Sequence, residues 1–288
     1  MLRMAVTTEA ETYHRLGELL PEYGIEVDHL AVDERIIPLS PSDSPWDLDG
    51  YDLGYVYPNR LMEGGVVDAM MDLPWVNDRD AVLRSRNKAG VIATVAAAGL
   101  PTPESVLISN PVSQGERVTA FERFDGPVVV KPNSTTRGVG VSRVDDVDSF
   151  VGVTDYLDLI HSYPATGDRS YLVQEFVPAA RDLRVMVIDG EYVGAVERAQ
   201  PADKRDHWKH NVHYGATATA TTPDPAIQSL AEQVATVLDI PFLGVDLLVT
   251  DDGPVVSETN ARPTIDDLEK YEPDFLERFV ALLQRTAT

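Results

Sequence analysis

Residues 244–260, GVDLLVTDDGPVVSETN, constrain the fold most, because two apolar stretches flank a turn-forming run at residues 251–253. This pattern predicts a β-hairpin. A three-residue loop would place Asp246 opposite Glu258, and the alternation of side chains along a strand would put Asn260 on the same face. A loop with an even number of residues would instead separate Asp246 from the other two.

Asp246, Glu258 and Asn260 all carry oxygen atoms of the kind that hard cations bind. Three such ligands on one face of a hairpin suit Mg²⁺. The alternative is an ordinary surface hairpin, because acidic residues are common throughout this chain. We expect a metal site here if the rest of the chain supplies a nucleotide to accompany the metal.

The chain is strongly acidic, with 47 Asp and Glu residues against 24 Lys and Arg and a net charge of −23. Non-specific binding of nucleic acid requires a basic face, so we expect no nucleic-acid partner. Aspartate outnumbers glutamate and arginine outnumbers lysine, a balance typical of proteins from salt-loving organisms. Because lysine is rare, Lys88 and Lys131 each invite a functional explanation.

Several classes of protein are excluded or disfavoured by what the sequence lacks. It contains no cysteine, which excludes disulfides, thiolate zinc sites and cysteine nucleophiles. It has no run of 18 apolar residues, so we expect neither a transmembrane helix nor a membrane partner. The first ten residues lack the apolar core and cleavage site of a signal peptide, which favours a cytoplasmic location.

Residues 1–84 alternate between apolar strands and a helix, which predicts a small α/β domain with a parallel sheet. The expected strands are residues 2–7, 25–32, 51–57 and 73–76, with a helix at residues 9–22 that ends at Gly24. No GxGxxG follows the first strand, so the fingerprint of a dinucleotide-binding domain is absent.

The rest of the chain mixes helices and strands as expected of two α+β units, at residues 85–170 and 171–288. Ser85 is expected to cap a helix that runs to Ala98, and Pro225 to open one that runs to Leu238. Strands are expected at residues 125–131, 171–177, 182–188 and 191–198, and further helices at residues 145–163 and 274–284.

Residues 128–141, VVVKPNSTTRGVGV, combine a buried strand with a loop of small residues. Lys131 offers a point charge for a phosphate, and Gly138 and Gly140 let backbone N–H groups approach phosphate oxygens. The stretch is not a P-loop, because no lysine follows a glycine as GxxxxGK[ST] requires. An ordinary strand–loop–strand with two glycines is the alternative.

Residues 174–198, QEFVPAARDLRVMVIDGEYVGAVER, predict a hairpin about the two-residue turn signal Asp189-Gly190. Glu175 and Phe176 end the preceding strand, where main-chain groups can meet a purine edge. Asp182 can accept hydrogen bonds from a ribose.

Arg184 and Arg198, in the same hairpin, can each hold a phosphate or carboxylate by two parallel hydrogen bonds. With a two-residue turn Arg184 would pair with Ala195, and Arg198 would lie on the opposite face. A loop with an odd number of residues would bring Arg198 to the face of Arg184, and the sequence leaves both arrangements open. A salt-bridged surface hairpin is the alternative to a binding site.

Taken in order, these segments resemble the ATP-grasp superfamily, and specifically its RimK-like ligases. The resemblance covers about residues 84–269 and rests on RNKAGVIATVAAAGLPTPES, KPNSTTRGVGV, LVQEFV, DLRVMV, KHNVHYGA, GVDLL and ETNARP. The stretch ARPTIDDLEKY is also similar to glutathione-synthetase-like members. The resemblance implies an ATP-grasp fold, in which an N-terminal parallel α/β domain precedes two α+β subdomains that clasp ATP.

The resemblance also implies an ATP-dependent carboxylate–amine ligase. A substrate carboxylate attacks the γ-phosphate, and an amine then displaces phosphate from the acyl phosphate to give an amide or peptide bond, with release of ADP and phosphate. The implied cofactors are ATP and two Mg²⁺ ions, with Mn²⁺ as a substitute. The implied partners are small-molecule or peptide carboxylates and amines, with glutamate or a similar amino acid as the group added. A homo-oligomer is expected, since family members are often dimers or tetramers.

Two other functions fit the same motifs. One is a phosphotransferase that uses the same ATP site, and the other is a nucleotide-binding regulatory protein with an inactive ligase site. The presence of Lys131, Asp246, Glu258 and Asn260 together favours an active enzyme, because an inactive site is expected to have lost at least one of them.

Carried over position by position, the resemblance implies roles for four groups of residues. The residues that would bind ATP are Lys88, Lys131, Thr135, Gly138, Gly140, Glu175, Phe176, Asp182 and Lys209. The metal ligands would be Asp246, Glu258 and Asn260. The catalytic residues would be Arg184, Arg198 and Asn211, and the substrate-binding residues Arg262 and His210.

Two stretches depart from the family pattern. RimK-like ligases usually carry Ser-x-Pro-Gly after the Glu-x-Asn motif, where residues 261–264 of this chain are Ala-Arg-Pro-Thr. The added Arg262 suggests capture of an acidic substrate group. In KHNVHYGA the usual arginine is missing, with Lys209 or His210 in its place.

His207, His210 and His213 are three residues apart, a spacing that raises the question of zinc. The stretch around them has no helical periodicity, and the ligase interpretation already assigns it to substrate and phosphate. We therefore expect a substrate loop there rather than a zinc site.

Overall fold

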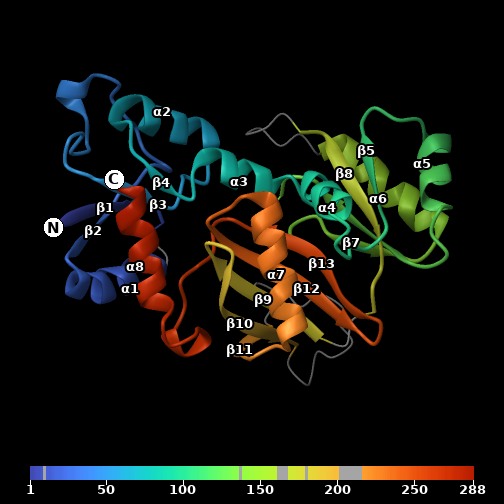
Figure 1. The fold of residues 1–288 in the computed structure, drawn as a ribbon. Helices are drawn as coiled ribbons and strands as arrows, with labels where there is room; N and C mark the ends of the chain where they lie inside the picture. The colour runs from blue at the N-terminus through green and yellow to red at the C-terminus, as the bar shows by residue number, and fades with distance from the viewer. Residues whose placement is uncertain (9–10, 136–137, 161–167, 179–180, 201–215) are drawn as a thin grey trace.

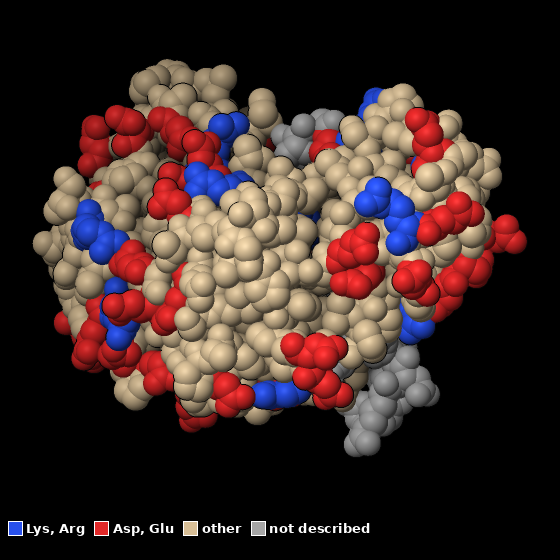
Figure 2. Space-filling model, turned by 45° about the vertical axis from the view of Figure 1, so that its right-hand side comes forward, with Lys and Arg blue, Asp and Glu red and all other residues tan. Residues whose placement is uncertain are grey.

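The computed structural model describes residues 1–8, 11–135, 138–160, 168–178, 181–200 and 216–288. Three sheets form its framework, and the chain builds the N-terminal, central and C-terminal sheets in that order (Figure 1). The last helix returns to the N-terminal sheet, so the two chain ends lie on the same side of the molecule. Within these ranges no helix has the length and apolar character needed to cross a bilayer. On the face shown in Figure 2, acidic side chains outnumber basic ones.

The N-terminal sheet is parallel, as the alternation of strands and helix predicted. Its order is β2-β1-β3-β4, and its strands are Leu2–Val6 (β1), Ile25–His29 (β2), Leu53–Tyr55 (β3) and Trp75–Val76 (β4). The helical segments are Glu11–Leu19 (α1), Leu20–Tyr23 (η1), Pro41–Asp43 (η2) and Leu61–Met71 (α2). Gly24 closes η1 with a φ of +73°, a conformation that favours glycine. Helix α2 was not predicted, because the adjacent Gly64 and Gly65 weaken its helical signal.

The central sheet is antiparallel, in the order β5-β8-β6-β7. Its strands are Ser105–Ser109 (β5), Val128–Pro132 (β6), Ser142–Val144 (β7) and Ser170–Glu175 (β8). Helices α5, Gln114–Phe121, and α6, Val147–Ile160, cover one face, where Val128 and Val130 pack into the core. Because side chains alternate along a strand, Lys131 projects from the other face.

Two helices join the N-terminal sheet to the central one, where a single helix from Ser85 was predicted. Helix α3 spans Arg79–Arg86 and helix α4 spans Lys88–Ala97. Ser85 lies inside α3, so the prediction that it caps the second helix is wrong. Asn87 is the cap, because its side-chain oxygen accepts the Gly90 N–H at 3.0 Å.

The C-terminal sheet is antiparallel, in the order β11-β10-β9-β12-β13. Its strands are Arg181–Ile188 (β9), Glu191–Ala199 (β10), Thr217–Ala220 (β11), Phe242–Thr250 (β12) and Gly253–Asn260 (β13). The helical segments are Pro225–Leu238 (α7), Leu268–Lys270 (η5) and Phe275–Thr286 (α8). Pro225 opens α7 as predicted.

In the β12–β13 hairpin the predicted loop length is wrong, but the predicted pairing of Asp246 with Glu258 is correct. Its turn has two residues, because Thr250 pairs with Gly253, whereas a three-residue loop was expected. A β-bulge at Ser257 then shifts the register by one residue, so Asp246 does lie opposite Glu258. Regular pairing from the same turn would have put Ser257 opposite Asp246.

The β9–β10 hairpin also combines a two-residue turn with a β-bulge. Its turn also has two residues, with Ile188 opposite Glu191, and a bulge follows at Val193. Beyond the bulge Arg184 pairs with Val196, two residues before Arg198. The two arginines therefore share a face, an outcome that the sequence left open.

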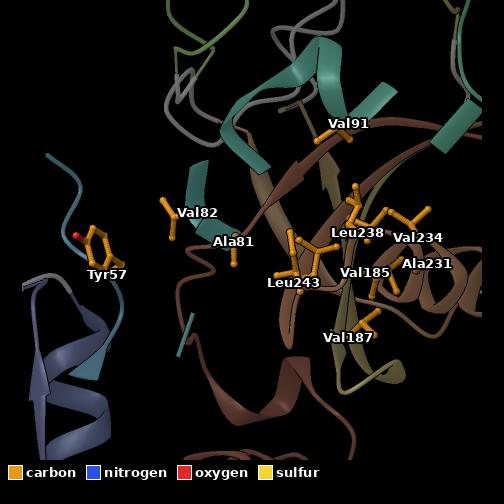
Figure 3. Close-up of a cluster of buried hydrophobic side chains, with 14 of the residues drawn as sticks. Tyr57, Ala81, Val82, Val91, Val185, Val187, Ala231, Val234, Leu238 and Leu243 are labelled. Atoms are coloured by element: carbon orange, nitrogen blue, oxygen red, sulfur yellow. The ribbon is translucent and has the colours of Figure 1, made fainter. Parts of the chain in front are cut away.

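The described residues form three hydrophobic cores. The central sheet with α5 and α6 has a core of its own. The N-terminal and C-terminal sheets share the other two, one of which joins residues such as Ala5 and Tyr57 to β9, β12 and α7. Figure 3 shows part of it, which extends from Tyr57 and Val82 at the left of the view to Val185 and Leu238 at the right. The other shared core includes Met4, Tyr55 and the α8 residues Phe275 and Phe279.

Candidate functional site

One face of the C-terminal sheet is divided into an apolar end and a charged end. Met186, Ile188 and Phe242 pack against the N-terminal sheet and α8. Further along the same strands, this face carries Arg184 of β9 and its neighbour across the strands, Asp246 of β12. The opposite face, covered by α7, is apolar.

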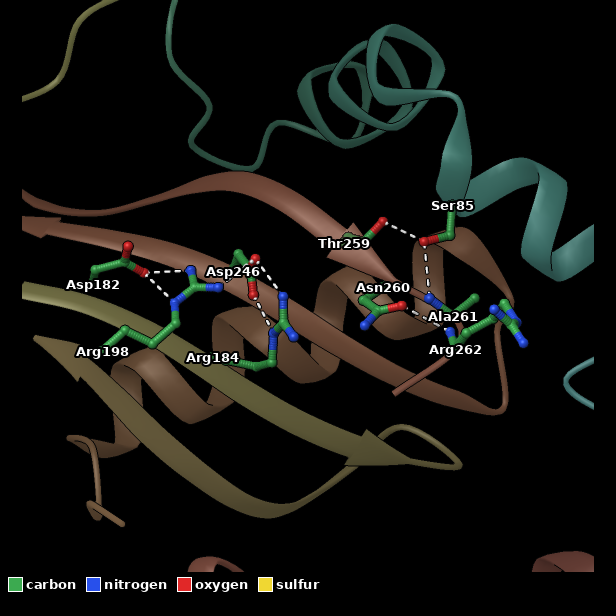
Figure 4. Close-up of polar contacts among 9 residues, drawn as sticks. All are labelled: Ser85, Asp182, Arg184, Arg198, Asp246, Thr259, Asn260, Ala261 and Arg262. Carbon is green, nitrogen blue, oxygen red and sulfur yellow. Dashed lines mark hydrogen bonds and ion pairs between the residues drawn. The ribbon is translucent and has the colours of Figure 1, made fainter. Parts of the chain in front are cut away.

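Asp246 is held by two arginines at this charged end (Figure 4). Its Oδ1 and Oδ2 atoms accept from Nε and Nη2 of Arg184 at 2.7 and 2.8 Å, a bidentate pair. Oδ2 also accepts from Nη1 of Arg198 at 3.0 Å. Burial raises the pKa of the Asp246 carboxyl, but the two guanidinium groups outweigh that effect and hold it at about 2.

Arg198 connects Asp246 to Asp182. Its Nε and Nη2 atoms donate to Oδ1 of Asp182 at 3.0 and 2.5 Å. Burial lowers the pKa of the Arg198 guanidinium, but the charges of Asp246 and Asp182 more than offset this and place it above its ordinary value. The β10 bulge makes this network possible, since regular pairing would turn Arg198 away.

Glu258 and Asn260 extend the polar face along β13. Oε1 of Glu258 lies 3.2 Å from Nζ of Lys88, which also donates to the carbonyl oxygen of Thr135. Oδ1 of Asn260 accepts the Arg262 N–H at 2.9 Å. The predicted pair Asp246–Glu258 is thus in place, with a lysine of α4 beside it.

Lys131 faces these charges from the central sheet. The residue is 6 % exposed. Burial and, to a smaller extent, Lys88 lower the pKa of its ammonium group, Glu258 and Asp246 raise it, and the net result is a pKa of about 8. A lysine from one sheet therefore lies within electrostatic reach of two carboxylates from another.

Two glycines that follow Lys131 adopt a left-handed backbone conformation. Gly138 and Gly140 have φ values of +69° and +76°, which favour glycine. The Thr135 hydroxyl donates to the Val139 carbonyl at 3.0 Å. A Cβ on Gly140 would lie 2.8 Å from the Pro132 ring, so this position also requires glycine for space.

Glu175 and Phe176 are restricted in the main-chain contacts that they can offer. The Glu175 N–H donates to the Glu104 carbonyl at 2.9 Å, and the Phe176 N–H donates to the Pro127 carbonyl at 2.8 Å. A purine at these positions would therefore meet acceptor groups rather than these donors. The Arg143 guanidinium lies 4.3 Å from the centre of the Phe176 ring.

Arg262 connects the end of β13 to the N-terminal part of the chain. Its Nε atom donates to the Tyr57 carbonyl at 2.9 Å and its Nη1 atom to Oδ1 of Asn59 at 3.2 Å. Its side chain points away from Asp246 and Arg184 (Figure 4). Arg86 also donates to Oδ1 of Asn59, at 3.2 Å.

Some predicted site residues cannot be placed. Lys209, His210 and Asn211, with His207 and His213, lie outside the described residues. Among the residues that are described, no group of three or more His, Cys, Asp or Glu side chains is arranged to hold a metal ion. The donor set Asp246, Glu258 and Asn260 consists of two carboxylates and an amide oxygen, which fits Mg²⁺ in its chemistry.

Sequence reasoning missed several polar residues that support the site. Asn77 is buried and bonds to Phe242 and to Ala261, and so fixes the start of β12 relative to the end of β13. The Ser85 hydroxyl lies 3.0 Å from that of Thr259 and accepts the Ala261 N–H at 3.1 Å. Buried asparagine and serine carry no sequence pattern of their own, so only their contacts reveal these roles.

Comparison with known proteins gives the same picture as the motifs. Residues 85–275 match the family model of the RimK-like ATP-grasp domain. The probable alpha-L-glutamate ligase of Stenotrophomonas maltophilia (strain K279a) is 31% identical over 195 residues, which are 67% of this chain and 63% of that protein. The match therefore spans less than two thirds of that relative.

Solved structures of ligases share the fold at low identity. The structure of a D-cycloserine synthetase has a TM-score of 0.74 at 16% identity and covers 100% of both chains. The D-alanine–D-alanine ligase of Bacillus anthracis complexed with ATP has a TM-score of 0.70 at 14% identity and covers 100% of this chain and 97% of that one. With the family model matching well over half of its length, this chain belongs to the RimK-like ATP-grasp family.

Proposed function

We propose that the protein is an ATP-dependent ligase that joins a carboxylate to an amine through an acyl phosphate, with release of ADP and phosphate. The observation that carries the proposal is the meeting of two sheets at one site. Lys131 of the central sheet and Lys88 of α4 lie beside the Asp246–Glu258 pair of the C-terminal sheet. Two cations opposite two carboxylates suit a triphosphate on one side and a divalent metal on the other.

In this proposal the lysines hold the phosphates and the loop with Thr135, Gly138 and Gly140 surrounds them. Both lysines are almost fully buried, so their charges act in a medium with little water. Asp182 would accept hydrogen bonds from the ribose, and the acceptor groups of Glu175 and Phe176 would suit the amino group of adenine.

Asp246, Glu258 and Asn260 would hold magnesium, and we propose two ions, with Mn²⁺ able to replace them. The metal would supply charge that draws electrons from the γ-phosphate and makes it easier to attack. Arg184 and Arg198 already contact Asp246, and they would carry positive charge at the place where the acyl phosphate forms. Asn211, Lys209 and His210 remain predicted members of this site.

We propose small-molecule or peptide substrates, with glutamate or a similar amino acid as the group added, because the curated relative is named a probable alpha-L-glutamate ligase. Arg262 remains the proposed contact for an acidic substrate group. We also propose a cytoplasmic, homo-oligomeric protein adapted to high salt, with domains at residues 1–84, 85–170 and 171–288.

The test is a screen for ADP release with Mg-ATP, amino acids and small carboxylates in high salt, followed by the masses of the products. The product of a ligase has the mass of its two substrates combined, less one water. A heavier product, or the absence of any such condensation product, would contradict a ligase. ATP binding without turnover on any substrate would favour a regulatory protein instead. A phosphorylated product that persists would favour a phosphotransferase.

A further inference from the structure

Asn133 occupies the junction between the strand that carries Lys131 and the helix that begins with Lys88. It follows Lys131 by two residues, at the end of β6, and is 8 % exposed. Its main-chain N–H donates to the Ser170 carbonyl at 3.1 Å, which fixes it to the neighbouring strand β8. Its remaining polar groups all contact the start of α4.

These contacts complete the N-terminus of α4. The first N–H groups of a helix have no partner within the helix. The Asn133 carbonyl accepts the Lys88 N–H at 3.2 Å, and Oδ1 of Asn133 accepts the Ala89 N–H at 2.8 Å. The third N–H, from Gly90, goes to Oδ1 of Asn87, which also accepts from Nδ2 of Asn133 at 3.0 Å.

One residue therefore ties two lysines together, because its main-chain carbonyl holds Lys88 and its side chain holds the neighbouring Ala89 and Asn87. Lys88 is the first residue of α4, so the Asn133 contacts fix its main chain directly. Its ammonium group then reaches the Thr135 carbonyl and Glu258. Two buried ammonium groups repel each other, and the lowering effect of Lys88 on the pKa of Lys131 is a sign of that repulsion.

We propose that Asn133 is a positioning residue that holds Lys88 beside Lys131, so that a triphosphate meets two cations already in place. This inference rests on the proposed function, because it assigns the two lysines to the same bound ATP. Positioning before binding removes part of the cost of ordering the site. Asn133 itself does not need to touch ATP.

The test compares Asn133→Ala with the wild-type full-length protein. The KM for ATP should rise about tenfold, while kcat changes less than about twofold, because the lysines hold ATP in both the ground state and the transition state. Asn87→Ser should act in the same direction, since serine keeps a helix cap but loses the bond from Asn133. Thr154→Val is the matched control, because it removes a buried hydrogen bond to Arg117 elsewhere in the central subdomain.

A double-mutant cycle with Lys88→Ala tests whether Asn133 acts through Lys88. The double variant should bind ATP no more weakly than Lys88→Ala alone. If Asn133→Ala weakens binding by the same factor in both backgrounds, or leaves the KM for ATP unchanged in a folded protein, the proposal is wrong.

Calorimetry with a non-hydrolysable ATP analogue and Mg²⁺ separates this inference from the proposed ligase activity. A wild-type chain that binds the analogue but makes no amide bond would contradict the ligase. Equal affinity of wild type and Asn133→Ala for the analogue would overturn the role of Asn133, whatever the turnover. Weaker binding by Asn133→Ala and unchanged binding by Thr154→Val would support it.

Discussion

The ammonium group of Lys88 lies 3.2 Å from Oε1 of Glu258 and joins the first residue of α4 to strand β13. The lysine side chain is 5% exposed and the glutamate side chain 33%. Under the proposed function, Lys88 would bind a phosphate instead of Glu258, and Glu258 would bind a metal ion instead of Lys88. Each of these partners is stronger than the one it replaces. The Lys88–Glu258 ion pair therefore neutralises both side chains at the place where a phosphate and a metal ion are expected to bind.

Replacing Glu258 by glutamine should abolish turnover of Mg-ATP and leave the fold intact. The amide keeps the size of the side chain and an oxygen for Lys88, but it removes the charge that a metal ion requires. We expect ADP release to fall by about 100-fold or more. Asp252→Asn, in the exposed turn of the same hairpin, is the control. Turnover near the wild-type rate in Glu258→Gln would refute the metal assignment.

Replacing Lys131 by methionine should stabilise the ligand-free protein and weaken ATP binding. The folded-state pKa of Lys131 is about 8, below the ordinary 10.5, so the unfolded chain binds more protons between these values. Wild-type stability should therefore rise with pH across this window, and burial of the charge should be most costly below pH 8.

The gain from Lys131→Met should reach up to about 3 kcal/mol in the free energy of unfolding at pH 7 and disappear toward pH 10.5. Urea unfolding at both pH values measures it, and calorimetry measures the loss of ATP affinity. Unchanged ATP affinity would contradict the phosphate role of Lys131, and a gain that does not depend on pH would contradict the burial of its charge.

Replacing Arg198 by methionine should destabilise the protein, because Asp182 loses its guanidinium partner and Asp246 loses one of two. We expect a loss of about 3 kcal/mol in the free energy of unfolding. Arg181→Met is the matched control in the same hairpin, since Arg181 pairs with Glu197 near the surface and should contribute about 1 kcal/mol or less. Equal losses in the two variants would contradict the special role of the buried network.

The contribution of this network should fade in acid. The pKa of Asp246 is held at about 2, below its ordinary 3.8, so its stabilising effect is present above pH 3.8 and is lost as the pH falls toward 2. Asp246→Asn should therefore cost stability at pH 7 and progressively less toward pH 2. Thermal unfolding of both proteins over this range measures the difference, which should stay constant if the arginines do not hold the carboxylate.

The sequence predicted most of the strands and the residue types of the site, but it missed strands β5, β7 and β11 and predicted the Asp246–Glu258 pairing from the wrong loop length. Turn chemistry is local, and Asp189-Gly190 indicated a two-residue turn correctly. The bulges at Val193 and Ser257 have no comparable local signal, because they depend on which side chains must reach the core. The Asp246–Glu258 pair was therefore correct although its predicted loop was not.

The interior of the molecule was less predictable than its strands. Asn133, Asn77 and Ser85 act through contacts between segments that are far apart in the chain, and no periodicity marks such residues. Arg262 was predicted to bind an acidic substrate group, and its guanidinium contacts Tyr57 and Asn59 of the N-terminal region. That role stays a prediction, to which the structure adds a second set of neighbours.

The two cores shared by the N-terminal and C-terminal sheets extend beyond the region that the family model matches. The family match begins at residue 85 and ends at residue 275, yet Met4, Tyr55 and Phe279 lie in one core with Phe242 of β12. A fragment cut at the family boundaries would expose the apolar end of the sheet that carries Asp246. The unit that must fold together is therefore larger than the matched domain, because residues outside it bury one end of the sheet on which the candidate site is built.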